Sequence, residues 1–136
     1  MPNPEQVPAF LPLTVAAAHS AAECAADPTT GEGARTVQRR AVEADSAAAD
    51  CWLALLAGCD APSRRALSSR LRALSEATTA LAGPRSLRRV GEAQVRIDEA
   101  VRDGDGEEFA EALVGYDQVV ATAVVSVRGR LGSATA

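Results

Sequence analysis

The sequence predicts an all-α protein, a compact bundle of four or five helices with up-and-down connectivity. Thirty of the 136 residues are alanine, the strongest helix former and a weak strand former, and only four are aromatic. Apolar residues recur every three or four positions along most of the chain, which is the spacing of helices with one buried face. This length is typical of one domain, so we expect a single helical-bundle domain over residues 1–136.

The N-terminal part predicts an extended arm followed by two helices. Prolines at positions 2, 4, 8 and 12 make residues 1–9 an extended arm, because closely spaced prolines prevent a regular helix. We expect the first helix to begin near Pro8 or Pro12 and to run to about Asp27. The Pro, Thr and Gly content of residues 27–33 predicts a loop. A second helix is then expected from Ala34 to Ala57, where Gly58 stops it.

Three more helices are expected in the second half. Asp60 and Ser63 are competing N-caps for the third helix, which Gly83 and Pro84 end. The fourth occupies the segment from Pro84 to Gly104, and the fifth starts at a capping box formed by residues 105 and 108. The fifth helix carries the strongest apolar stripe, and residues 132–136 are expected to be a disordered tail. That stripe consists of Phe109, Leu113, Tyr116, Val120, Val124, Val127 and Leu131.

The charges are unevenly spread. The chain carries a net −4, with −5 over residues 1–60, +6 over 61–96 and −5 over 97–136. The basic middle indicates either an anionic partner or helices that pair with one another inside the bundle. The net negative charge, the absence of lysine and the lack of interleaved aromatics argue against nucleic acid. We therefore expect a solvated face, or a patch for an acidic protein surface, at Arg85, Arg88, Arg89 and Arg96, with Glu92 pairing with Arg88 and Arg96.

The cysteines and the hydropathy pattern bear on the cellular compartment. The three cysteines are an odd number without the spacing of a disulfide framework, so free thiols in a reducing cytoplasm are expected. The N-terminus lacks the pattern of a signal peptide, and no stretch reaches the roughly 20 consecutive apolar residues of a membrane span. The sequence accordingly predicts no membrane association.

One group of residues resembles half of a metal site. His19, Glu23 and Asp27 are spaced four apart, which places them on one face of the first helix. Carboxylate-bridged metal bundles need matching ligands on further helices, and the chain has none. A solvated polar stripe explains the spacing, so neither a metal nor another cofactor is expected.

Polar residues also fall within apolar helical faces. Asp45 lies on the same side of the second helix as Trp52, and Asp117 falls between apolar positions of the fifth helix. A carboxylate that faces a core must be paired or shift its pKa, and we expect arginines of the third and fourth helices or the Tyr116 hydroxyl as partners. Two hypotheses stay open: an ion pair that fixes helix register, or a ligand pocket. The candidate ligand-binding residues are His19, Asp45, Trp52, Tyr116 and Asp117.

The functional expectation is a non-enzymatic interaction or regulatory module that forms a homodimer through its fifth helix. That helix is apolar around most of its circumference, and a helix of this kind is buried on nearly every side. The interface residues expected are Phe109, Val114, Val119 and Val125. The N-terminal arm is a competing cover for the same face. The alternative function is a small-molecule-binding protein, or a small helical enzyme, with the pocket named above.

Overall fold

The protein folds as five α-helices and one short 3₁₀-helix, and the predicted all-α bundle is confirmed. The computed structural model describes residues 8–58 and 62–135, with residues 128–135 as backbone only. No strand occurs in the described ranges. The helices are α1 (Pro12–Cys24), α2 (Pro28–Ala57), α3 (Ser63–Ala82), η2 (Pro84–Ser86), α4 (Leu87–Asp103) and α5 (Gly106–Thr135).

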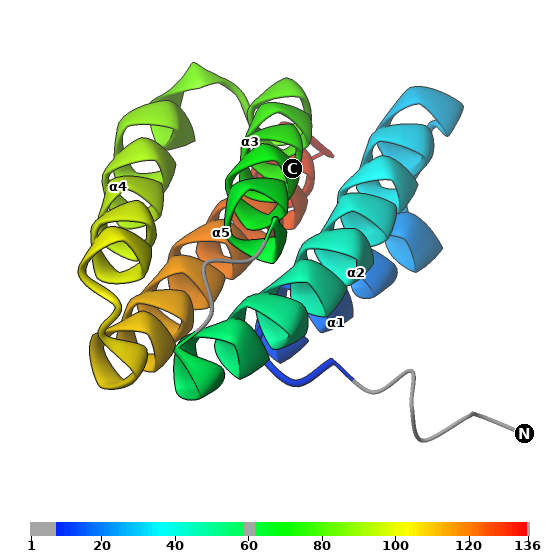
Figure 1. The fold of residues 1–136 in the computed structure, drawn as a ribbon. Helices are drawn as coiled ribbons and strands as arrows, with labels where there is room; N and C mark the ends of the chain where they lie inside the picture. Colours follow the sequence, from blue (N-terminus) through cyan, green and yellow to red (C-terminus); the bar gives the residue numbers. More distant parts are fainter. Residues whose placement is uncertain (1–7, 59–61, 136) are drawn as a thin grey trace, which may run out of the picture.

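Successive helices alternate in direction, and α5 starts below the lower end of α4 and passes behind α3 (Figure 1). It packs mainly against α1, α3 and α4 and to a smaller extent against α2, so the other four α-helices of the chain all contact it. The large buried side chains come mostly from α3, α4 and α5, whereas α2 turns alanines toward the core. These small residues let α1 and α3 lie close to α2. The fully buried alanines of α2 are Ala34, Ala41, Ala44 and Ala48.

The start of α2 differs from the sequence prediction. Residues 27–33, expected as a loop, form its cap and first turns, and α1 ends at Cys24 rather than near Asp27. Asp27 is the N-cap of α2, with its Oδ2 accepting the Thr30 N–H at 3.0 Å, and Pro28 takes the first helical position. A Cβ on Gly33 would lie 3.2 Å from Leu81 Cδ1, so this glycine permits close packing against α3. The helix-starting effect of Asp27 and Pro28 therefore outweighs the low helix propensity of Gly31 and Gly33.

The other helix ends follow the sequence more closely. Gly58 and Gly104 have φ values of 68° and 66°, the left-handed conformation that ends α2 and α4. Asp105 Oδ1 accepts the Glu108 N–H at 3.1 Å, which confirms the predicted cap of α5. Helix α3 begins at Ser63, but its N-cap residue is Pro62 and no side chain caps it, so the predicted Ser63 cap is wrong; the competing cap Asp60 lies outside the described residues. Helix α5 continues through residues 132–135, where the sequence predicts a disordered tail; residues 1–7 of the predicted arm are outside the described ranges.

One segment of the described chain, Gly106–Val127 of α5, is long and apolar enough to cross a membrane by length and composition alone. Half of that segment is buried inside the bundle. The core helix of a soluble protein has the same character, and the central position of α5 accounts for its apolar residues. The fold is thus compatible with a soluble protein.

Candidate functional site

Asp45 holds the chain that leads into α1. Its Oδ1 accepts the N–H groups of Phe10 at 2.7 Å and Leu11 at 2.9 Å, and its Oδ2 accepts that of Ala9 at 3.2 Å. A half-buried carboxylate on α2 is thereby surrounded by backbone donors. The sequence predicts an arginine or the Tyr116 hydroxyl as the partner of Asp45. This prediction is wrong, because the described partners of Asp45 are backbone amides.

Asp117 of α5 acts in the same way on the first turn of α1. Its two carboxylate oxygens accept the N–H groups of Leu13 at 3.0 Å and Thr14 at 2.8 Å, and the Thr14 hydroxyl donates to the Asp117 carbonyl at 3.2 Å. The N-cap residue Leu11 has no side-chain acceptor of its own. Asp117 is therefore the cap of α1, supplied from another helix, and it satisfies N–H groups that would otherwise be buried without partners.

Trp52 belongs to an aromatic cluster at the end of the bundle where α1 begins. Its ring centroid lies 6.2 Å from the rings of both Phe10 and Phe109, and the Trp52 and Phe109 rings are stacked. Phe109 is fully buried, and Trp52 is half-buried. These contacts account for the position of Trp52 as packing between α2, α5 and the segment before α1.

The Tyr116 hydroxyl is part of a separate polar group, in which it joins α5 to α3. It lies 2.9 Å from Ser75 Oγ and donates to the Leu71 carbonyl at 3.2 Å, and Ser75 in turn contacts Gln94 of α4. Burial raises the pKa of Tyr116, so the hydroxyl stays protonated. The four central candidates for the predicted pocket therefore each engage their own set of partners rather than lining one shared cavity.

His19 is exposed on α1, with its Nε2 3.5 Å from Glu23 Oε1. Asp27, the third member of the predicted polar stripe, belongs to the cap of α2 instead. Among the described residues, no group of three or more metal-binding side chains occurs. His19 is thus part of a solvated surface and has no described contact with Asp45 or Asp117.

The predicted basic patch divides into paired and unpaired arginines. Arg88 donates to Glu92 at 3.0 Å, as expected. Arg96 pairs instead with two α5 carboxylates, Glu108 at 2.6 Å and Glu111 at 3.8 Å, so its predicted pairing with Glu92 is wrong. Arg85 and Arg89 have no carboxylate partner in the described part of the chain. Their guanidinium groups are the unpaired charges of the patch.

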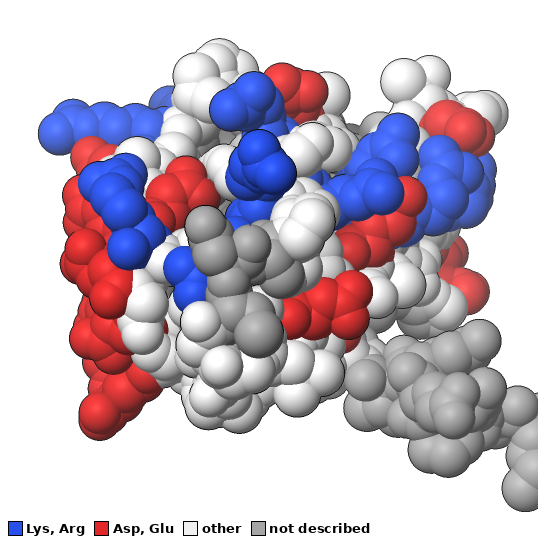
Figure 2. Space-filling model, viewed as in Figure 1, with Lys and Arg blue, Asp and Glu red and all other residues white. Residues whose placement is uncertain are grey.

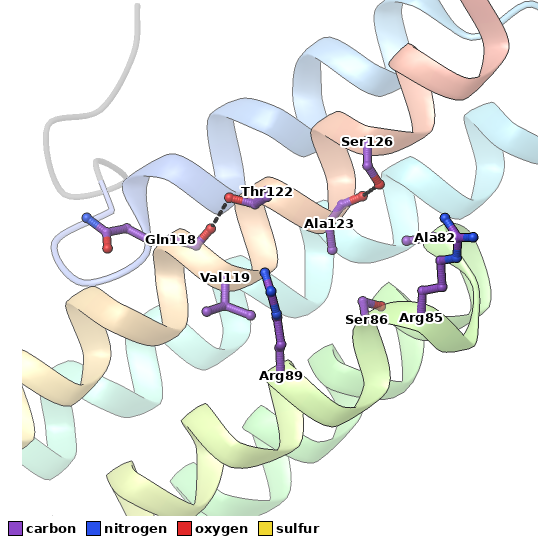
Figure 3. Close-up of a pocket in the computed structure, with 9 residues that line it drawn as sticks. All are labelled: Ala82, Arg85, Ser86, Arg89, Gln118, Val119, Thr122, Ala123 and Ser126. Carbon is purple, nitrogen blue, oxygen red and sulfur yellow. Dashed lines mark hydrogen bonds between the residues drawn. The ribbon is translucent and has the colours of Figure 1, made fainter. Parts of the chain in front are cut away.

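These two arginines border a groove where α4 and η2 diverge from α5. The groove has a volume of about 550 Å³, and we call it the α5 groove (Figure 3). Figure 3 shows Arg89 extending from α4 toward Val119 and Thr122 of α5, while Arg85 lies at the other end, near Ala82. The lining residues are Ala82, Arg85, Ser86, Arg89, Gln118, Val119, Thr122, Ala123 and Ser126.

The hydroxyl groups of the α5 groove already donate to backbone carbonyls. Ser86 donates to Gly83 O at 3.1 Å, Thr122 to Gln118 O at 2.7 Å and Ser126 to Ala123 O at 2.6 Å. The guanidinium groups of Arg85 and Arg89, with the Gln118 amide, are therefore the donors that the described lining offers a ligand. The remaining lining is mostly apolar, so the groove suits an apolar surface that carries negative charge.

The residues expected at a dimer interface differ in how far they reach the surface. Phe109 lies inside the core, where a second chain cannot contact it, and Val119 is half-buried in the α5 groove. Val114 and Val125 are 58% and 57% exposed on the outer face of α5. The apolar character of α5 is largely explained by its neighbours in the same chain, but these two valines remain uncovered.

Charge is separated along the bundle. Figure 2 shows arginines gathered over the upper part, where α3 and the turn into α4 lie, and acids along the edge formed by α4 and the start of α5. The first turn of α5 contributes Glu107 and Glu108, and Glu111 follows one turn later. One end of the α5 surface is thus acidic, and the other end, beside the α5 groove, is basic.

Sequence reasoning found Arg85 and Arg89 but missed the groove between them and α5. The polar positions Gln118, Thr122 and Ser126 recur every four residues on α5, and this spacing was the available signal. Comparison of the chain with protein-family models, curated proteins and solved structures gives no match. A function must therefore be inferred from these residues and their geometry.

Proposed function

We propose that the protein is a non-enzymatic interaction module that docks an acidic, apolar helix of a partner against α5. The docking surface consists of the α5 groove and a neighbouring strip on the outer face of α5, which we call the α5 strip. The strip is formed by Val114, Gln118, Ala121 and Val125. A second copy of the chain is the partner that the sequence predicts, and the docking surface is suited to an acidic helix whatever its source.

The observation that carries this proposal is the pair of unpaired arginines above an apolar floor. Arg85 and Arg89 lack carboxylate partners among the described residues, while the floor of the groove includes Val119 and Ala123. Exposed ion pairs contribute little affinity, about 0–1 kcal/mol each, so apolar burial must supply most of the binding free energy. The arginines then select partners that carry negative charge and raise the association rate.

A helix fits this surface better than an extended strand. The groove lies between two diverging helices, and every described backbone group along its α5 wall belongs to a helix, so no strand edge is offered to a peptide. Arg85 of η2 and Arg89 of α4 lie at the two ends of the groove, so a partner helix that runs along the groove meets both guanidinium groups. Carboxylates one turn apart on that helix lie on one face and can be directed toward both arginines.

The ligand-pocket alternative has less support. Asp45 and Asp117 accept five backbone N–H groups between them, and the Tyr116 hydroxyl bonds to Ser75 and Leu71. Groups with these partners are already satisfied, and a small molecule would have to displace them.

A cytoplasmic location is part of the proposal. Cys24 is a free and exposed thiol at the end of α1, and Cys51 is a free and buried one. An exposed free thiol is favoured in a reducing compartment. Cys59 lies outside the described residues.

The proposal is tested by titrating a synthetic amphipathic helix that carries glutamates four residues apart beside a leucine face. Fluorescence anisotropy at nanomolar protein concentration should detect binding, and the same peptide with lysines for glutamates should bind far more weakly. Arg85→Glu with Arg89→Glu should weaken binding at least about tenfold, because it replaces attraction by repulsion at both positions. Arg35→Glu with Arg39→Glu is the matched control, because it reverses two exposed arginines with the same spacing on α2.

An unchanged dissociation constant after reversal at Arg85 and Arg89, or an equal weakening in the α2 control, would contradict the proposal. Circular dichroism of each variant checks that the helical content is unchanged. All four positions are exposed, so no loss of folding is expected.

A further inference from the structure

We infer that the helix docked on this surface is α5 of a second copy of the chain, packed antiparallel about a two-fold axis. The inference rests on the proposed docking surface and commits that surface to one occupant. Its basis is self-complementarity. When two α5 helices pack antiparallel, the apolar residues of the two α5 strips meet, and the acidic end of each helix lies near the basic end of the other.

The apolar part of the α5 strip has the spacing that such pairing needs. Val114 and Val125 are eleven residues apart, which is about three helical turns, so both lie within about 20° of one face. Their separation along the helix axis is about 16 Å. The exposed Gln118 and the buried Ala121, which is 9% exposed, lie between them. The strip therefore has a valine at each end and a small residue near its centre.

A two-fold axis passing between residues 119 and 120 pairs these positions with one another. Val114 then faces the partner's Val125, and Gln118 faces the partner's Ala121, with each contact repeated by symmetry. Two of the exposed large hydrophobic side chains on each copy are covered in this way. The small Ala121 allows the two helices to approach closely at the centre.

The charges favour the antiparallel direction over the parallel one. In the antiparallel register, position 111 of one copy lies opposite position 128 of the other, close to Ser126 and the Arg85 end of the α5 groove. Glu111 lies about 60° around α5 from Val114, in the direction of the α5 groove. Under a two-fold axis, the grooves of the two copies lie on the same side of the helix pair. Each Glu111 thus comes near the partner's Arg85. Parallel packing would instead place the acidic starts of both α5 helices together.

Glu111 is available for this contact. Its carboxylate is 65% exposed and lies 3.8 Å from Arg96, which has a closer partner in Glu108 at 2.6 Å. The neighbouring Glu107 is exposed as well. Arg85 and Arg89 have no described carboxylate of their own, so the contact supplies these arginines with an acidic partner, and it gives Glu111 a second one beside Arg96.

Disulfide trapping tests the direction of packing. In a Cys24→Ser, Cys51→Ala, Cys59→Ser background, Val114→Cys combined with Val125→Cys should give a covalent dimer under mild oxidation. Neither single substitution should, because two copies of the same position lie about 16 Å apart along the axis. Cross-linking by the single variants would indicate parallel pairing and overturn the inference.

Charge reversal tests the ionic contact. Arg85→Glu alone or Glu111→Arg alone should raise the dissociation constant of the dimer at least about tenfold, because each change alters two symmetric contacts. Their combination should restore it to near the wild-type value. Glu32→Arg with Arg35→Glu, an exposed pair on α2, is the control and should have no effect. Sedimentation velocity measures each constant, and additive weakening in the combined variant would overturn the contact.

The mass of the wild-type protein separates this inference from the proposed function. Light scattering coupled to size exclusion should give about twice the monomer mass of 14.0 kDa. A 14.0 kDa species at high micromolar concentration overturns the second copy as occupant. If that monomer still binds the glutamate peptide through Arg85 and Arg89, the proposed function stands without the dimer; if it does not, both fall.

Discussion

Asp117 should be among the costliest single side chains to remove, because it caps a helix from another part of the chain. Truncation to alanine strands the N–H groups of Leu13 and Thr14, which the carboxylate now accepts at 3.0 and 2.8 Å. An unsatisfied buried donor costs about 1–3 kcal/mol. Thr14 is fully buried, whereas Leu13 is 50% exposed and only its N–H contact is partly buried, so we assign about 2 and about 1 kcal/mol, a total of about 3 kcal/mol. Asp117→Asn keeps one acceptor oxygen and should cost roughly half as much.

Urea unfolding followed by the fluorescence of Trp52, the single tryptophan, measures this loss. Hydrogen exchange adds a local readout, since the Thr14 amide should exchange faster in Asp117→Ala. Asp50→Ala is the control, because Asp50 is exposed on α2 and should change stability by well under about 1 kcal/mol. Equal small effects at both positions, with Thr14 exchange unchanged, would refute the capping role of Asp117.

Three further outcomes are expected. Asp45→Ala should destabilise the protein by about 3 kcal/mol in the same urea assay, through the loss of three backbone contacts, and a cost as small as that of Asp50→Ala would contradict it. Cys24 should react rapidly with Ellman's reagent in the folded protein, whereas burial, which also raises the thiol pKa, should protect Cys51 until unfolding; equal rates would be inconsistent with the fold. Burial raises the pKa of Asp98 above 3.8, so stability linked to this group is present below pH 3.8 and lost as the pH rises through its folded-state pKa. Asp98→Asn should remove this pH-dependent loss of stability, which is measured as the urea midpoint at a series of pH values. A variant whose midpoints follow the same pH profile as the wild type would contradict this role of Asp98.

The fold could be predicted from the sequence because local signals agree. Alanine content, helical periodicity and the glycines at positions 58 and 104 all indicate helices and their ends, and the structure has them. The start of α2 was mispredicted because turn chemistry in residues 27–33 competes with an N-cap at Asp27 followed by proline. The choice between a loop and a helix here depends on the packing of Gly33 against Leu81, which belongs to α3 and is distant in sequence.

The polar residues illustrate a different limit. Periodicity correctly indicated that Asp45 and Asp117 face the interior, since charged residues within apolar faces are uncommon. Their partners are backbone groups 34 to 36 and 103 to 104 residues away in sequence. A backbone N–H carries no sequence signature, so arginines or a tyrosine were expected in its place.

The α5 groove also required the tertiary structure. Arg85 and Arg89 were recognised as basic, but whether an arginine has a partner depends on which helix lies opposite. Arg96 meets the acids of α5, whereas Arg85 and Arg89 lie where α4 has diverged from it. Helix divergence is a property of packing, and the sequence pattern does not contain it.

The solvent exposure of the valines on α5 tests the docking surface most directly, because it responds to any occupant. In the free protein, Val114 and Val125 are 58% and 57% exposed, and Val42 on α2, at 49%, provides an internal reference. A soluble paramagnetic reagent broadens the methyl resonances of exposed valines. As protein concentration rises, or as the glutamate peptide is added, broadening at Val114 and Val125 should fall while that at Val42 stays constant. If all three valines stay equally broadened under both conditions, nothing covers α5, and the docking surface is contradicted.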